Sequence, residues 1–272
     1  MSKPLLSPLS LVAAGLFCLA GAAHGEKWEA TLTPFTPGSF PQPRAVHAQY
    51  AFGWSGLTAA TVDVHFGKAS DDRYKLEGKG GTVGLARATW RYDLNHTALA
   101  DAQTLRPISV TESEKTRSKE KNTEVAFSPE LVVSLRQERK SGVMKTRERR
   151  FEFPNALSLE SALLFLRSQP MPAGTAYRVV VYPATSSYLC TLTVKGREKI
   201  TVPAGTYDAI KLDVQLSKIG EKRELIPHKK FSSATVWLSD DSDRLVLRVE
   251  AQVFVGTVFA ELRSAEYEKP KP

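Results

Sequence analysis

Residue types that catalyse reactions occur in this chain, but none has the spacing that its chemistry requires. A serine nucleophile of the elbow type needs Gly-x-Ser-x-Gly on a strand-to-helix turn, and the stretch Gly53-Trp54-Ser55-Gly56 lacks that spacing. The histidines after residue 25 form neither His-x-x-x-His nor His-Glu-x-x-His, so no zinc site is expected. These histidines are His47, His65, His96 and His228. The sequence therefore does not predict an enzyme.

Calcium, phosphate and thiol chemistry lack complete motifs as well. Asp240, Asp241 and Asp243 could bind calcium, but the glycine and the distal glutamate of a calcium loop are missing, and a polar hairpin turn is favoured. The glycine-rich stretch 78–82 lacks the spacing of a phosphate-binding loop. Cys190 has no neighbouring base, so we expect a buried, inert thiol. The sequence therefore predicts no metal site and no cofactor.

The first 25 residues predict export. The apolar segment Leu9–Ala23 and the small residues after it are typical of a secretory signal peptide, cleaved after Ala23 or Gly25. The segment is too short for a convincing membrane span. The bulky Phe17 before Cys18 argues against a lipid anchor. We expect a periplasmic protein whose mature chain has no transmembrane segment.

The composition favours a globular protein with a basic surface. The chain has 272 residues, of which 42% are hydrophobic, enough for one large β domain or two small ones. Its formal net charge of +8 suits contact with phospholipid headgroups, lipopolysaccharide or nucleic acid, although a solvated basic surface is favoured. A basic run between Arg136 and Arg150 could bind anionic headgroups. It lacks the aromatic series of a base-stacking surface, so nucleic acid is not expected as a partner.

Alternation of apolar and polar residues predicts β-strands along most of the chain. The clearest case is the stretch Arg197–Leu216, which reads as two strands joined at Val202–Gly205. Beyond this turn one face carries Ile210, Leu212, Val214 and Leu216, and the other face carries Ala209, Lys211, Asp213 and Gln215. This is the pattern of a half-buried antiparallel strand. Ala86–Leu94 is expected to be another strand.

The predicted domain organisation is simple. After the signal peptide at 1–25, four prolines indicate an extended lead-in at 26–45. A single β domain is expected over 46–267, and a frayed tail over 268–272. The charge-rich segments between 108 and 153 predict long hairpins that face water on at least one side.

One helix is expected within this β domain. An apolar stripe at helical spacing is formed by Leu159, Ala162, Leu163 and Leu166. Asn155 or Ser158 can cap the helix, and Pro170 ends it. At about three turns the helix would be marginal alone in water, so it must be held by packing.

Two apolar features are candidates for binding. Tyr50, Phe52 and Trp54 alternate, so their rings lie on one face of a strand and either fill the core or line a ligand cavity. The segment 253–256 places bulky apolar residues beside a turn, where they either fold back onto the sheet or contact a membrane or partner.

Five motifs in a fixed order carry a resemblance to a known family. They are Tyr50-x-Phe52-x-Trp54-x-Gly56-Leu57, Leu105-Arg106-Pro107, Ser161–Arg167, Thr201–Tyr207 and Val236–Asp240. With these motifs the chain resembles the bacterial exported domain-of-unknown-function family 3108. It departs from the family pattern at Ala60, where a glycine is expected, and at Asn155, where an acidic cap is expected.

The resemblance implies a mainly β fold. Its expected core is a strongly curved antiparallel sheet, a half-barrel or open barrel, with one short helix packed in the concave face. Such a fold is similar to that of periplasmic lipoprotein carriers and implies a hydrophobic-ligand site between sheet and helix. The residues expected to line this site are Tyr50, Phe52, Trp54, Leu159, Leu163, Leu166 and Trp237.

Two functions from different classes remain open. The leading hypothesis is a periplasmic, non-enzymatic protein that binds a hydrophobic or amphipathic ligand, such as a lipid, or supports maintenance of the cell envelope. The alternative is a structural or protein-interaction module with a filled core and no ligand, whose partner adds a strand at a sheet edge. A cavity between sheet and helix distinguishes the two.

Overall fold

A computed structural model describes residues 27–227, 233–253 and 256–268. The predicted signal peptide, the tip at 254–255, His228 and all but the first residue of the predicted tail lie outside the described residues. The chain divides into two compact units, Met1–Thr31 and Leu32–Pro272. In the first unit the described part contains one short 3-10 helix, η1 (Trp28–Thr31).

The second unit is built on a fifteen-stranded antiparallel sheet, which confirms the predicted fold class. The strands are β1 (Val46–Trp54), β2 (Leu57–Ser70), β3 (Arg73–Thr82), β4 (Tyr92–Asp101), β5 (Pro107–Thr116), β6 (Lys119–Phe127), β7 (Leu131–Lys140), β8 (Val143–Glu152), β9 (Ala176–Val181), β10 (Tyr188–Val202), β11 (Gly205–Ile219), β12 (Leu225–Pro227), β13 (Ser233–Ser239), β14 (Val246–Val253) and β15 (Gly256–Tyr267). Their order is β8-β7-β6-β5-β4-β3-β2-β1-β15-β14-β13-β11-β10-β9, with β12 beside β11. Since β8 and β9 end this order without pairing with each other, the sheet is open.

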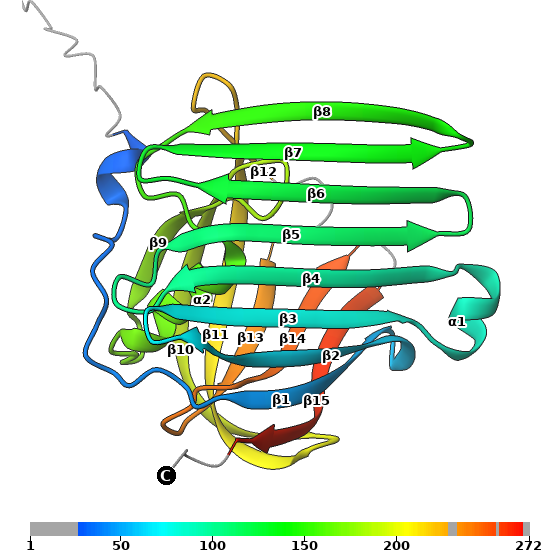
Figure 1. The fold of residues 1–272 in the computed structure, drawn as a ribbon. Helices are drawn as coiled ribbons and strands as arrows, with labels where there is room; N and C mark the ends of the chain where they lie inside the picture. The colour runs from blue at the N-terminus through cyan, green and yellow to red at the C-terminus, as the bar shows by residue number, and fades with distance from the viewer. Residues whose placement is uncertain (1–26, 228–232, 254–255, 269–272) are drawn as a thin grey trace, which may run out of the picture. The chain divides into compact units, whose positions relative to one another are not determined.

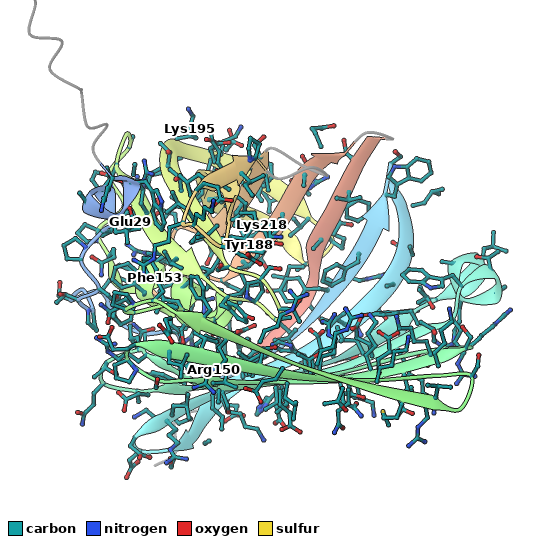
Figure 2. The ribbon with its side chains drawn as sticks, turned by 90° about the horizontal axis from the view of Figure 1, so that it is seen from above. Glu29, Arg150, Phe153, Tyr188, Lys195 and Lys218 are labelled. Atoms are coloured by element: carbon teal, nitrogen blue, oxygen red, sulfur yellow. The ribbon has the colours of Figure 1, made fainter. Side chains whose placement is uncertain are left out.

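The sheet curves into two walls. Strands β1–β8 run side by side as one wall, and β9–β11 with β13–β15 lie behind them as the other (Figure 1). The view from above shows the two walls facing each other (Figure 2). They meet where β1 pairs with β15, from Val46 opposite Tyr267 to Trp54 opposite Val258. Side chains on the inner face of one wall can therefore face those of the other.

The predicted helix is α2 (Leu159–Ser168), which lies between the walls at one end (Figure 1). Ser158 is its cap, since its hydroxyl accepts the Ser161 N–H at 3.1 Å. Phe165 is fully buried in a cluster with Leu212 of β11 and Leu238 of β13, and Leu164 packs in a second cluster around the β1–β15 pairing. The helix is thus held by packing against both walls.

A second helix, α1 (Gly84–Thr89), lies at the opposite end, between β3 and β4 (Figure 1). The expected strand over Ala86–Leu94 was therefore wrong in its first part. Gly84 adopts a φ of +53°, a left-handed conformation that glycine adopts without steric cost and that lets the chain turn back after β3. The Arg87 guanidinium then contacts the Asp93 carboxylate at 2.7 Å and secures the turn against β4.

The hairpin of β10 and β11 confirms the expected turn, with Val202 paired to Gly205. One side chain lies differently from the predicted alternation. Ala209 was placed on the polar face, yet it is fully buried in the second cluster. The tip of the hairpin reaches β15, where the Ala204 N–H donates to the Leu262 carbonyl at 3.2 Å, and Ala209 is buried in one cluster with Val202 of the hairpin and Leu262 of β15.

Candidate functional site

The inner face of the sheet contains a cavity of about 510 Å³ at the end that carries α1. We call it the apolar trough. It is formed where β1–β4 meet β14 and β15, and its lining is Phe52, Gly53, Trp54, Ala59, Ala60, Val62, Gly81, Thr82, Trp90, Tyr92, Leu94, Val249, Ala251, Val258, Phe259 and Ala260. Its volume lies within the range of about 300–1,000 Å³ that is typical of small-molecule sites.

Aromatic rings of the trough remain open to solvent. Phe52 is 40% exposed, Trp54 is 45% exposed and Trp90 is 59% exposed. The Trp90 ring stacks on Tyr92, with 5.2 Å between the ring centroids. Large apolar side chains seldom remain exposed together on a soluble protein unless they contact something. The trough is therefore a surface that a hydrophobic molecule can cover.

Two hydroxyl groups of the lining are satisfied within the protein. The Thr82 hydroxyl donates to the Trp90 carbonyl at 2.9 Å, and the Tyr92 hydroxyl donates to Glu114 at 3.0 Å. Because these groups already have partners, they offer little to a polar ligand. The trough is thus suited to hydrocarbon more than to a hydrogen-bonding substrate.

A glycine between two of the rings allows the strands to close. A Cβ on Gly53 would lie 2.2 Å from the Leu57 carbonyl oxygen and 2.4 Å from a ring carbon of Phe259. Such contacts are impossible without moving the backbone, so any larger residue would push β1 away from its neighbours. Gly53 therefore keeps Phe52 and Trp54 at the edge of the same cavity.

A smaller cavity of about 200 Å³ lies between α2 and strands β2–β4. We call it the helix cavity. Its lining is Phe66, Tyr74, Lys75, Leu76, Ala98, Leu99, Ala100, Leu159, Glu160, Leu163, Leu164 and Arg167. It lies between sheet and helix, where the sequence predicts a ligand site, and five residues of α2 line it.

A charged cluster separates the two cavities. Along β4, Leu94 lines the trough and Ala98 lines the helix cavity, and His96 lies between them on the same face. Its Nε2 lies 2.9 Å from Glu160 of α2, and its Nδ1 lies 3.6 Å from Glu112 of β5. Burial alone would lower the pKa of His96, but the two carboxylates outweigh it and raise the pKa to about 9.

The seven residues expected to line one site are found in different places. Phe52 and Trp54 line the trough, and Leu159 and Leu163 line the helix cavity. The other three pack in the core. The Tyr50 hydroxyl donates to the Val246 carbonyl at 2.9 Å, Leu166 is buried in the first cluster, and the Trp237 indole N–H donates to Glu198 at 2.7 Å. Contact of any of the seven residues with a ligand remains a prediction.

Sequence reasoning missed Trp90 and the trough residues of β14 and β15. Val249 and Ala251 belong to an alternating strand, so their shared face was readable from the sequence. Nothing local showed that this face lies opposite Phe52, because the contact depends on the pairing of β1 with β15. Trp90 follows α1 directly, and that helix was itself missed.

No metal-binding grouping is found among the described residues. No three His, Cys, Asp or Glu side chains in this part of the chain are placed to hold a metal ion. Cys190 is buried, and burial raises the pKa of its thiol to about 12, so it is a poor nucleophile at neutral pH. Asp241 accepts hydrogen bonds from the Ser239 hydroxyl and the Asp243 N–H, as in a polar turn.

Comparison with known proteins places the chain among proteins of unknown function. A protein-family model described as "Protein of unknown function (DUF3108)" matches residues 49–263. No curated protein matches. A β-barrel-like protein of the domain of unknown function DUF1849, from Brucella abortus, aligns with a TM-score of 0.57 and 9% identity, over 84% of this chain and 100% of its own. At this identity the likeness shows the fold alone.

Two other solved structures align more weakly. A candidate lipoprotein from Parabacteroides distasonis gives a TM-score of 0.34 at 10% identity, over 85% of this chain and 99% of its own. A candidate exported protein with a YmcC-like fold, from Bacteroides fragilis, gives 0.32 at 10% identity over the same shares. In the described part of this chain, no helix has the length and apolarity needed to cross a membrane.

Proposed function

The chain belongs to the DUF3108 family of proteins of unknown function, and we propose that it binds a hydrophobic or amphipathic ligand, such as a lipid, on the inner face of its sheet. The function is binding, without bond-making. The observation that carries the proposal is the apolar trough of about 510 Å³, with its three exposed aromatic rings. Burying such a surface against an acyl chain stabilises the complex by about 0.8 kcal/mol for each CH₂ group removed from water.

The trough is favoured over the helix cavity as the main site. The helix cavity is smaller, about 200 Å³, and α2 already covers it. The trough has no helix over it in the described part of the chain. We therefore assign Phe52 and Trp54 to ligand contact, and Leu159 and Leu163 to a secondary position.

Export to the periplasm is part of the proposal. It is supported by the sequence of residues 1–25, in which an apolar segment and small residues follow a basic residue. A ligand-binding protein of this kind would meet lipids at the cell envelope, where such molecules are abundant.

An interaction module is the second candidate, favoured by apolar side chains outside the trough. Leu57 is 70% exposed and Leu85 in α1 is 88% exposed, and neither lines the cavity. A protein partner could cover them. A titration with a small apolar molecule separates the two functions, because a partner-binding module needs no affinity for such a molecule.

The test is a fluorescence titration of the mature protein with N-phenyl-1-naphthylamine, an uncharged apolar probe. Phe52→Glu places a carboxylate in the trough, and Leu159→Glu, the matched control, places one at the helix cavity on a residue that is 51% exposed. We expect micromolar binding by the wild type, a loss of about tenfold or more in Phe52→Glu, and a change below about threefold in Leu159→Glu.

Each other outcome has a definite meaning. Loss of affinity in Leu159→Glu alone would move the ligand to the helix cavity. Equal affinity in all three proteins would show that the probe binds elsewhere, and no binding by the wild type would favour the interaction module. Native mass spectrometry of the purified protein then identifies any co-purifying lipid.

A further inference from the structure

Cations are segregated on one face of the edge strand β8. Alternate residues of a strand point to the same face, and in β8 one such set contains three successive cations, Lys145, Arg147 and Arg149, between Val143 and Phe151. The intervening set is mixed and consists of Met144, Thr146, Glu148, Arg150 and Glu152, with Arg150 only 3.5 Å from Glu148. In the first set every charged residue is a cation.

This basic face is the inner face of the wall. Arg147 pairs with Arg136 of β7, and the register continues through Thr123 of β6 and Glu112 of β5 to His96 of β4. Residues directly opposite each other on adjacent strands lie on the same side of a sheet. His96 contacts α2 between the walls, so the cations lie on that side as well.

The cations surround a cavity of about 160 Å³, which we call the basic cavity. Its lining is Ser134, Arg136, Glu138, Lys145, Arg147, Arg149 and Thr185. The single carboxylate, Glu138, is already paired with Lys119 at 2.8 Å. Four cations therefore share this cavity with one neutralised acid.

The arrangement costs stability in the absence of an anion. Arg147 lies directly opposite Arg136, and like charges in that position destabilise a pair of strands. The Arg136 Nε donates to the Thr123 hydroxyl at 3.1 Å, which orders the side chain without neutralising it. Lys145 lies opposite Glu138, whose carboxylate is paired with Lys119, and Arg147 forms no ion pair with any described residue. The missing counter-charge is the feature that a ligand would supply.

We propose that the basic cavity binds the phosphate group of an amphipathic ligand whose apolar part lies in the trough. This inference rests on the proposed function and adds the chemical class of the ligand. Guanidinium groups hold phosphate oxygens through paired, charge-assisted hydrogen bonds, and two opposed arginines can do so from both sides. A phosphate also relieves the repulsion between Arg136 and Arg147.

The two cavities lie on one continuous face. The register runs from Lys145 through Glu138, Lys121 and Glu114 to Leu94, which lines the trough. Four strand spacings of about 4.8 Å give roughly 19 Å across the sheet, which a headgroup and a long acyl chain together can span. The intervening Lys121 and Glu114 neutralise each other at 2.9 Å. The cations without a paired carboxylate therefore lie at the end of this row of residues that is farthest from the trough.

The experiment compares three probes by isothermal titration calorimetry. They are 1-palmitoyl lysophosphatidic acid, monopalmitoylglycerol, which has the same chain without phosphate, and inorganic phosphate. The test variant is Arg136→Gln/Arg147→Gln. The matched control is Arg139→Gln/Arg150→Gln, which removes the same charge from the same two strands on the opposite face.

For the wild type we expect lysophosphatidic acid to bind at least tenfold more tightly than monopalmitoylglycerol, with an advantage that shrinks as salt is added. The test variant should lose that advantage and keep its affinity for monopalmitoylglycerol. The control should keep both affinities. Circular dichroism melting should show that the test variant is folded, since its substitutions remove repulsion at the surface of the wall.

Other results overturn the inference. Equal affinity of the wild type for the two lipids would mean that phosphate is not recognised, and an equal loss in the control would mean a general effect of surface charge. Binding of inorganic phosphate as tight as that of lysophosphatidic acid would make the cavity a free-phosphate site. If inorganic phosphate bound but neither lipid did, the proposed function of binding a hydrophobic ligand would be wrong, while the basic cavity would still be an anion site.

Discussion

The two ends of the inner face are made from the same strands, but one end is buried core and the other lines an open cavity. At one end, Ala98 and Ala100 of β4 lie against α2, and the surrounding side chains form two buried clusters. At the other end, Leu94 and Tyr92 of the same strand line an open trough. The difference is α2, which covers the first end, whereas no helix residue in the described part of the chain lines the second. An apolar strand face thus becomes core or binding surface according to what lies over it.

The largest expected effect is at the helix-covered end. Phe165→Ala removes a fully buried ring that packs against the tilted ring of Phe35, with 4.9 Å between the centroids. We expect a loss of about 3–5 kcal/mol in the free energy of unfolding, measured with urea, because the cavity left behind adds to the lost burial. Leu159→Ala, at a half-exposed position of the same helix, should cost about 1 kcal/mol or less. Equal costs would contradict the claim that α2 is held by its buried face.

The charged cluster at the boundary predicts a pH dependence. The pKa of His96, about 9, lies above its ordinary value of 6.5, so its stabilising contribution is full below pH 6.5 and is lost as the pH rises through 9. Burial would raise the pKa of Glu160, but its hydrogen bond to His96 outweighs this and lowers it, so the contribution of Glu160 is lost only in acid. The free energy of unfolding should therefore fall between pH 6.5 and 9.5.

The expected fall is about 2–3 kcal/mol relative to His96→Gln, in which the dependence should be flat. Urea denaturation at the two pH values measures it. His65→Gln, which removes an exposed histidine whose Nε2 lies 2.8 Å from a Glu268 carboxylate oxygen, serves as the control and should keep the wild-type slope. A flat wild-type profile would mean that His96 does not connect α2 to the sheet.

The smallest effects are expected at the open end. Trp90→Ser and Leu85→Ser both replace exposed apolar residues, so each should change the free energy of unfolding by about 0.5 kcal/mol or less. Only Trp90 lines the trough. Trp90→Ser should weaken binding of N-phenyl-1-naphthylamine severalfold, and Leu85→Ser should leave it unchanged. Similar losses in both would show that the binding surface extends onto α1.

Local patterns in the sequence predicted most of the fold. The strict alternation after Gly205 and the apolar stripe at 159–166 each determine an element and its buried face. The prediction was wrong where one glycine changed the local structure, at Gly84, and where a residue on the polar face was buried by packing near the tip of a hairpin, at Ala209. Both depend on how the chain turns or packs beyond the range of a local pattern.

The candidate site was less predictable because burial depends on partners far away in the sequence. Phe52 and Trp54 were correctly placed in alternation on one strand, and the structure puts both at one cavity. Trp237 and Leu166 have the same apolar character, but each is covered by other side chains. The basic cavity likewise depends on the register that brings Arg147 opposite Arg136. Such contacts are determined by the pairing register between strands, which the amino-acid composition of each strand does not reveal.

The pairing of β1 with β15 has a consequence for how the protein folds. Val46 lies opposite Tyr267, so β1 and β15, the first and last strands in the sequence, must meet before the two walls are joined. Contacts this distant along the chain form slowly, because a long loop must close before they stabilise anything. Residues of both paired strands line the trough, among them Phe52 of β1 and Val258 of β15. A chain that ended before β15 would therefore have two separate walls and no binding site between them.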